Sequence, residues 1–467
     1  MLSSVLYGFA AFIFALIVII VIFLVTKAVS RWPGWSLSFL MLLDVSASMV
    51  RFALSERTLP LIHGAQSDGD TGETLLLKLP SIVVTGCAFV LCIAEGVFLY
   101  NVKGVGRYNN RVLEPPTDIT IAFFVFYVAL NIIPIFFGQQ YYFHTNLIYP
   151  FFIYLAFFLG SQMSSIDPVI VIKQGLGLIV LCSLIAAAVS PKMSIEPNHA
   201  GLVPGFVTRL WGVTGHANSL GAVASALLIF EAAEPSAMVW LRTCVLAAAG
   251  LAMFWSQSKT SIIAALVGLS IIYGWHILAG TRVKSSDGSK HGYSIATGLV
   301  VVFSAAIALA VVWMMVYDWD VISSSLNMEA TEGLSTASGR TVIWAAAIEG
   351  GLENPLFGQG AGYWQRLNLW GAIHAHNLFL QVFSTAGIFG LAALMVFLYF
   401  LVRYSIRAST ITHGGSLAFM AMFFLRAMTE ANMQTHAIQS GEFFAMMAYL
   451  LYVMDRGAKP IKSSYEY

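Results

Sequence analysis

The sequence has few charged residues. Of its 467 residues, 10% are Asp, Glu, Lys or Arg and 58% are hydrophobic, whereas a soluble domain carries about 25% charged residues. This shortage excludes an ordinary soluble protein and indicates a polytopic membrane protein. The formal net charge of +1 points to no particular partner, and we expect binding to membrane lipids but not to nucleic acid.

Cysteine is also scarce, and several motifs are missing. The four cysteines lie inside apolar runs, without zinc or haem spacing and away from polar loops where a disulfide would be useful, so we interpret them as buried small apolar residues. The chain has no Walker motif, no G-x-S-x-G motif and no zinc signature. No energy source for transport is therefore visible.

Long apolar runs fill most of the chain. A helix rising 1.5 Å per residue needs about 20 residues to cross a hydrocarbon core about 30 Å thick. The first run lacks a basic n-region and an A-x-A site, so we expect it to be retained as a span. The sequence thus predicts an all-α transmembrane domain over residues 1–467 with about twelve or thirteen spans, near 5–26, 36–53, 80–100, 118–138, 145–162, 168–190, 214–233, 237–255, 259–280, 294–317, 376–402, 412–431 and 436–454.

Lysine and arginine fall on alternate loops. Because cytoplasmic loops are enriched in basic residues, the distribution places the N-terminus outside and the C-terminus inside. The longest outer loop is 318–375, between two spans. Apolar residues four positions apart predict a short amphipathic helix over 345–352, which Asn354-Pro355 would end.

Several polar side chains are predicted to lie on the outer side: Arg209, Lys259, Arg340, His374 and His376. Arginine and lysine near a membrane face often extend to lipid headgroups, and Arg340 could form a weak surface ion pair with Glu332 or Glu349. In the alternative interpretation these cations bind phosphate, aided near Arg209 by the helix start at 215–218.

The histidines also allow two interpretations. Residues at i and i+2 do not share a helix face, so we expect no metal site within one helix at His374 and His376. Asn377 could cap the following span, and a neutral imidazole could accept a proton from a hydroxyl. Glu430 could pair with Arg426 at i, i+4, or serve a site, because charges at that depth are costly.

The chain resembles the O-antigen ligase and polymerase superfamily in a series of motifs, most clearly over residues 200–397. The motifs are Gly-His-Ala-Asn-Ser-Leu-Gly at 215–221, Ser-Lys-Thr at 258–260, Gly-Arg-Thr-Val-Ile-Trp at 339–344, Asn-Pro-Leu-Phe-Gly-Gln-Gly at 354–360, His-Ala-His-Asn-Leu-Phe-Leu-Gln at 374–381 and Gly-Ile-Phe-Gly-Leu at 387–391.

This resemblance implies a C-type glycosyltransferase architecture in the bacterial inner membrane, with the active site facing the periplasm. Such enzymes take a glycan from undecaprenyl pyrophosphate without a nucleotide sugar, a cofactor or a metal. Carried over, the pyrophosphate-binding role falls on Arg209 and Arg340, and that of the general base on His376, with His374 as the alternative. Further candidates for binding pyrophosphate or glycan are Lys259, which stands where many family members have arginine, and Asn377, His216, Asn218 and Glu430.

Two acceptors are compatible with the resemblance. The Gly-Arg-Thr-Val-Ile-Trp spelling favours a polymerase of O-antigen or exopolysaccharide repeat units, for which a chain-length regulator is a candidate partner. The histidine-bearing loop is shared with ligases that use lipid A-core as the acceptor. A lipid or sugar transporter is a more distant alternative, because the predicted spans carry few polar residues.

We predict that loop 318–375 is periplasmic and that the C-terminus is cytoplasmic, because of the one-sided Lys/Arg distribution. Single cysteines introduced into a cysteine-free variant should react with a membrane-impermeant maleimide at 335–365 and not at 282–290. The opposite labelling pattern would contradict this orientation.

Overall fold

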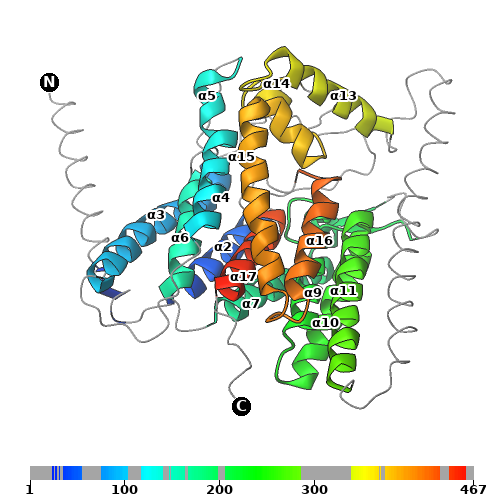
Figure 1. Ribbon diagram of the computed structural model, residues 1–467. Coiled ribbons are helices and arrows are strands. Elements are labelled where there is room, and N and C mark those ends of the chain that lie inside the picture. Colours follow the sequence, from blue (N-terminus) through cyan, green and yellow to red (C-terminus); the bar gives the residue numbers. More distant parts are fainter. Residues whose placement is uncertain are drawn as a thin grey trace.

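The computed structural model shows a bundle of helices, several of them long and apolar (Figure 1). The structure describes residues 24–25, 27–28, 31, 35–54, 75–103, 117–139, 147, 149–163, 167–197, 206–284, 338–367, 369, 374–431 and 441–458. Among these, the only strands are the short β1 (Ile195–Glu196) and β2 (Arg209–Leu210), which pair antiparallel.

The described helices follow the hydropathy of the sequence closely. The longer ones are α2 (Trp35–Leu54), α3 (Leu75–Lys103), α4 (Thr117–Asn131), α6 (Tyr149–Met163), α7 (Pro168–Val189), α9 (Ala217–Ala233), α10 (Val239–Ser256), α11 (Lys259–Lys284), α13 (Ser338–Glu353), α15 (Leu378–Ala408), α16 (Gly415–Ala427) and α17 (Gly441–Ala458). The short ones are α5 (Ile133–Phe137), α8 (Pro191–Ser194) and α14 (Tyr363–Leu367).

Six described helices are long and apolar enough to cross a membrane, and four shorter apolar helices accompany them. The protein is therefore an all-α, multi-pass membrane protein, as the sequence predicted. The predicted spans at 5–26 and 294–317 lie outside the described residues, apart from residues 24 and 25.

Helix α9 lies at the centre of the bundle and is buried along nearly its whole length. It packs against α7, α10, α11, α16 and α17. At its C-terminal end, Lys173 contacts Glu231 at 2.7 Å, and Arg456 contacts Glu234 and Asp167. These ion pairs hold the ends of α7, α9 and α17 together, away from the N-terminus of α9.

Helix α15 is broken at Gly387, which has φ +62° and ψ −155°. The loop at 354–360 fits into the break and completes the hydrogen bonds that the helix leaves open. The backbone bonds run from Gln359 N to Ser384 O (2.8 Å), from Gly360 N to Thr385 O (3.1 Å), from Ile388 N to Pro355 O (2.8 Å) and from Phe389 N to Leu356 O (3.2 Å). The break therefore fixes the segment after α13 against α15.

Helix α13 contains the helix predicted at 345–352 but differs from the prediction in where it begins and in which face is buried. It begins at Ser338, so Arg340 lies in a helical first turn and not in a loop. Its buried side chains include Ile343 and Ala347, whereas Ile348 and Leu352 are exposed. The predicted helix is present, but its buried face was wrongly placed: Trp344 is partly buried against Ile343 and Ala347, whereas the apolar side chains four and eight positions after it face outwards. Figure 1 shows α13 and α14 over one end of α15.

Replacing Gly387 with alanine should destabilise the protein. A Cβ there would lie 2.5 Å from the carbonyl carbon and oxygen of Leu356. The backbone of Gly387, with positive φ and ψ near 180°, lies in a region that essentially only glycine adopts and that costs another residue about 1–3 kcal/mol. Displacing the loop adds to that cost.

Gly250→Ala in α10 is the matched control, because nothing lies within 4 Å of its Cβ position and alanine is favoured in a helix by about 0.5–1 kcal/mol. Thermal unfolding in detergent should give a clearly lower midpoint for Gly387→Ala only. Equal midpoints for the two variants would contradict the role given to the break.

Candidate functional site

The buried carboxylate of Glu430, just after α16, joins three parts of the chain. Its side chain is only 5% exposed. Asn218 Nδ2 donates to Glu430 Oε1 at 2.8 Å, and Arg340 Nη2 lies 3.4 Å from the same oxygen. His376 Nδ1 lies 3.1 Å from Oε2. These four residues and Arg209, which binds Asn218, are called the Glu430 cluster below.

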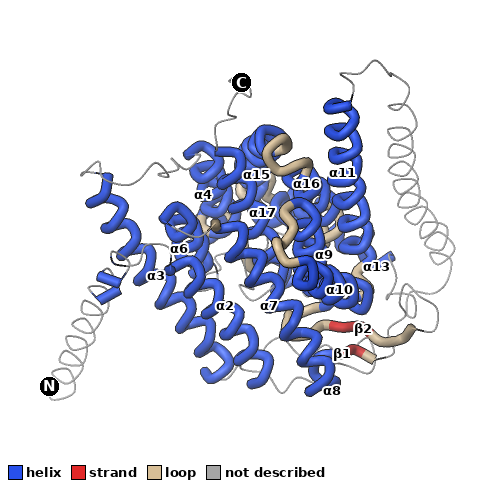
Figure 2. Tube along the Cα trace, turned by 90° about the horizontal axis from the view of Figure 1, so that it is seen from below, coloured by secondary structure: helices blue, strands red, loops and turns tan. Residues whose placement is uncertain are grey.

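Arg209 reaches this cluster from the β1–β2 pair. In that pair Glu196 faces Arg209, and the Glu196 carboxylate accepts a hydrogen bond from Trp211 Nε1 at 2.8 Å. Arg209 Nε donates to the carbonyl of Ser256 at 2.8 Å, and its Nη2 donates to Asn218 Oδ1. Figure 2 shows the strands beside α8 and α10 at the edge of the bundle. Backbone and side-chain contacts thus fix the direction of the guanidinium.

Several helix ends meet at the cluster. Asn218 lies in the first turn of α9, and Thr260, in the first turn of α11, is 3.1 Å from Thr429. His376 and Asn377 directly precede α15. A helix N-terminus carries unsatisfied N–H groups and a partial positive charge. The guanidinium groups of Arg209 and Arg340 are opposed by the carboxylates of Glu430 and Glu196. The three helix ends add further positive potential, so the region favours an anion.

The turn that carries His376 is held on several sides. The carbonyl of Ala375 accepts from Trp344 Nε1 at 3.0 Å, and its N–H donates to Gln381 Oε1 at 2.8 Å. Asn377 Oδ1 accepts from the N–H groups of the first turn of α15, and its Nδ2 donates to the carbonyl of Met428. Asn377 is therefore the N-cap of α15.

His376 itself has a left-handed backbone, with φ 49°. Such a conformation is uncommon for a residue with a side chain, although histidine and asparagine adopt it more readily than most. It costs about 1–3 kcal/mol and persists only where the surrounding contacts impose it. Here it directs Nδ1 towards Glu430 while leaving the side chain 28% exposed.

Electrostatics distinguish the two histidines. Burial, together with the neighbouring charge of His376, lowers the pKa of His374 to about 3, and His374 Nδ1 accepts the backbone N–H of His376 at 3.1 Å. The carboxylate of Glu430, in contrast, is compensated by contacts from His376 Nδ1 and from the guanidinium of Arg340. His376 is thus the imidazole that is paired with an ionised carboxylate.

The predicted site residues are only partly brought together. Arg209, Arg340, His376, Asn218 and Glu430 meet, whereas the exposed Lys259 makes no hydrogen bond or ion pair with any described member of the cluster. His216 is the N-cap of α9, where its Nδ1 accepts the N–H of Asn218, and its ring packs on Trp211.

Arg340 pairs with Glu430 and, within the described chain, not with Glu349; Glu332 lies outside the described residues. The sequence also gave no role to Trp344 and Gln381, which hold the turn of His376. Both residues lie inside the motifs at 339–344 and 374–381, and this position was the only sequence feature that could have indicated their role.

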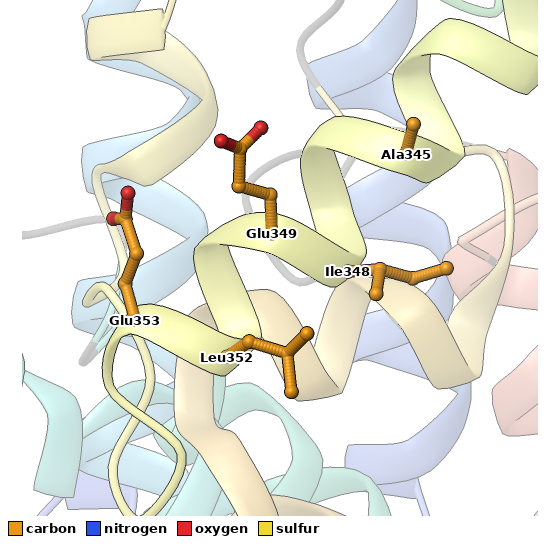
Figure 3. Close-up of a pocket in the computed structure, with 5 residues that line it drawn as sticks. All are labelled: Ala345, Ile348, Glu349, Leu352 and Glu353. Carbon is orange, nitrogen blue, oxygen red and sulfur yellow. The ribbon is translucent and has the colours of Figure 1, made fainter.

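A hollow on the exposed side of α13 is separate from the cluster (Figure 3). It is lined by Ala345, Ile348, Glu349, Leu352 and Glu353. Its charged groups are two carboxylates, which would repel a phosphate. The Glu430 cluster is therefore the better candidate site for an anionic substrate.

The fold and the cluster define a multi-pass membrane protein with an anion-favouring, imidazole-bearing site at one end of its helix bundle. The family model described as O-Antigen ligase matches residues 244–395, so this part of the chain is similar to that family. The comparison with curated proteins gives no match.

The matched region contains Arg340 and His376, while Arg209, Asn218 and Glu430 come from outside it.

Proposed function

We propose that the protein transfers a glycan from undecaprenyl pyrophosphate to a sugar hydroxyl at the periplasmic face of the bacterial inner membrane. The observation that carries the proposal is the Glu430 cluster, in which a carboxylate-paired imidazole lies beside two guanidinium groups. The similarity of residues 244–395 to the O-antigen ligase family supports a lipid-linked glycan as the substrate class.

The guanidinium groups of Arg209 and Arg340 bind the pyrophosphate in this proposal. Each makes charge-assisted contacts to phosphate oxygens, and these contacts strengthen as the leaving group takes up charge. Arg340 is the more accessible of the two, with 36% of its side chain exposed. It can turn from Glu430, 3.4 Å away, to the substrate.

His376 is the general base. Its Nδ1–H donates to Glu430 Oε2, so the lone pair of Nε2 is free to accept the proton of the acceptor hydroxyl. The acceptor oxygen then attacks the anomeric carbon, the bond from that carbon to the pyrophosphate oxygen breaks, and the configuration inverts. The proton stays on Nε2 until it passes to water. No step requires a metal.

We infer polymerisation of repeat units as the main activity, from the spelling of the motif at 339–344. The similarity to the O-antigen ligase family favours ligation as the second candidate, with lipid A-core as the proposed acceptor. Both use the same donor and the same cluster, and they differ only in the acceptor.

A purified preparation given a single lipid-linked repeat unit tests the proposal. Longer lipid-linked chains would establish a polymerase, and products formed only after addition of lipid A-core would establish a ligase. No transfer to either acceptor, together with counterflow of lipid or sugar across vesicles, would overturn the proposal in favour of a transporter.

The variant His376→Asn should lose about 10²–10⁴-fold in turnover, because a positioned base contributes that much. Asparagine tolerates the left-handed backbone at this position, so the variant removes the imidazole without imposing new strain. Binding of the donor lipid should change little, because the arginines hold the pyrophosphate.

His374→Asn is the matched control. Its side-chain oxygen can still accept the backbone N–H two residues on, so most of the turnover should remain. If His374→Asn were inactive and His376→Asn active, the roles would be exchanged. If both retained turnover, neither histidine would be the base.

A further inference from the structure

We propose that His374, His376 and Glu430 form a binding site for a divalent transition-metal ion such as Zn²⁺, and that this ion inhibits the enzyme. The inhibitory part rests on the proposed function, whereas the binding itself does not. The two histidines lie in the turn before α15, and Glu430 lies three residues after the end of α16.

The geometry suits such an ion. One ligand atom from each residue lies within 4.8 Å of the others. His376 Nδ1 and Glu430 Oε2 are 3.1 Å apart, and the two imidazole centroids are 4.1 Å apart. Around a tetrahedral zinc ion with bonds of about 2.0–2.1 Å, neighbouring ligand atoms lie about 3.3 Å apart. To close the site, ligand atoms that lie at most 4.8 Å apart would approach one another by up to about 1.5 Å through side-chain rotation.

The ligand set is also appropriate. Two imidazoles and one carboxylate are a common zinc set that leaves a fourth position open. Their spacing at i and i+2 argued against a site within one helix, but the two histidines lie in a turn and the carboxylate comes from elsewhere. Asn218 and Arg340 contact Oε1 of Glu430. These contacts orient the carboxylate and leave Oε2 for the ion.

Two features oppose binding and set its limits. His374 Nδ1 accepts the N–H of His376 at 3.1 Å, so one backbone hydrogen bond is exchanged for a metal bond. The positive charges of Arg209 and Arg340 also disfavour a cation. The site should therefore bind late first-row transition-metal ions such as cobalt, copper and zinc, which form strong bonds with imidazole ligands, and not magnesium or calcium.

Inhibition follows from the tautomer of His376. An ion between Nδ1 and Oε2 takes the place of the proton that they share. The neutral imidazole then carries its one proton on Nε2, where no lone pair remains to accept a proton from the acceptor hydroxyl. The ion thus removes the general base without touching the pyrophosphate-binding arginines.

The test uses full-length protein in detergent, stripped with EDTA and titrated with Co²⁺, whose visible absorption reports tetrahedral coordination. Wild type should show saturable absorption that Zn²⁺ displaces and that His374→Asn and Glu430→Gln lose. In the transfer assay, Zn²⁺ should inhibit wild type at least about tenfold, reversibly with EDTA. The variant His374→Asn should need at least about tenfold more Zn²⁺ for the same inhibition.

Absence of Co²⁺ absorption in wild type would overturn the site whatever the transfer assay shows. Absorption that persists unchanged in both variants would place the ion elsewhere, also overturning the proposal. Binding with the expected variant pattern but without inhibition would overturn the inhibitory role. If no transfer occurs with or without EDTA while Co²⁺ binds as expected, the proposed function fails, the inhibitory role falls with it, and the metal site stands.

Discussion

The buried negative charge of Glu430 determines how the helix ends around it are arranged. The Glu430 carboxylate is almost sealed from solvent, and an ionised carboxylate in such a place is very costly unless hydrogen bonds and positive charges compensate it. Asn218, Arg340 and His376 supply that compensation from α9, α13 and the turn before α15. The same contacts that make the carboxylate tolerable bring the groups of the proposed chemistry together.

The rest of the fold serves to hold those three segments in place. The break of α15 at Gly387 receives the loop at 354–360, which fixes α13 relative to α15. Trp344 on α13 donates a hydrogen bond to the carbonyl of Ala375, which fixes the helix that carries Arg340 relative to the turn that carries His376. At its far end, α9 is held by the ion pairs of Arg456 and Lys173.

Local patterns in the sequence predicted the helices but not how they meet. Apolar runs gave the described spans to within a few residues, because the bilayer imposes both length and composition. Motifs singled out Arg340 and His376, and the wider resemblance over residues 200–397 added Arg209. The start of α13 at Ser338 and the strand pair that carries Arg209 were not predicted.

The joining role of Glu430 was missed for a physical reason. Glu430 is 212 positions from Asn218 and 54 from His376, and no local periodicity reports contacts over such separations. At the sequence level, Arg426, four residues earlier on the same predicted helix, was the obvious partner. Only the packing of α9, α13, α15 and α16 shows which groups compensate the carboxylate.

The kinetics of Glu430→Gln test most directly the claim that this carboxylate positions and polarises the base. Glutamine keeps the size of the side chain and an oxygen for Asn218, but it cannot stabilise an imidazolium. The claim predicts a fall in kcat of about 10²-fold or more with the KM for the donor lipid nearly unchanged. A variant with the kcat of wild type, or one that lost only donor affinity, would contradict it.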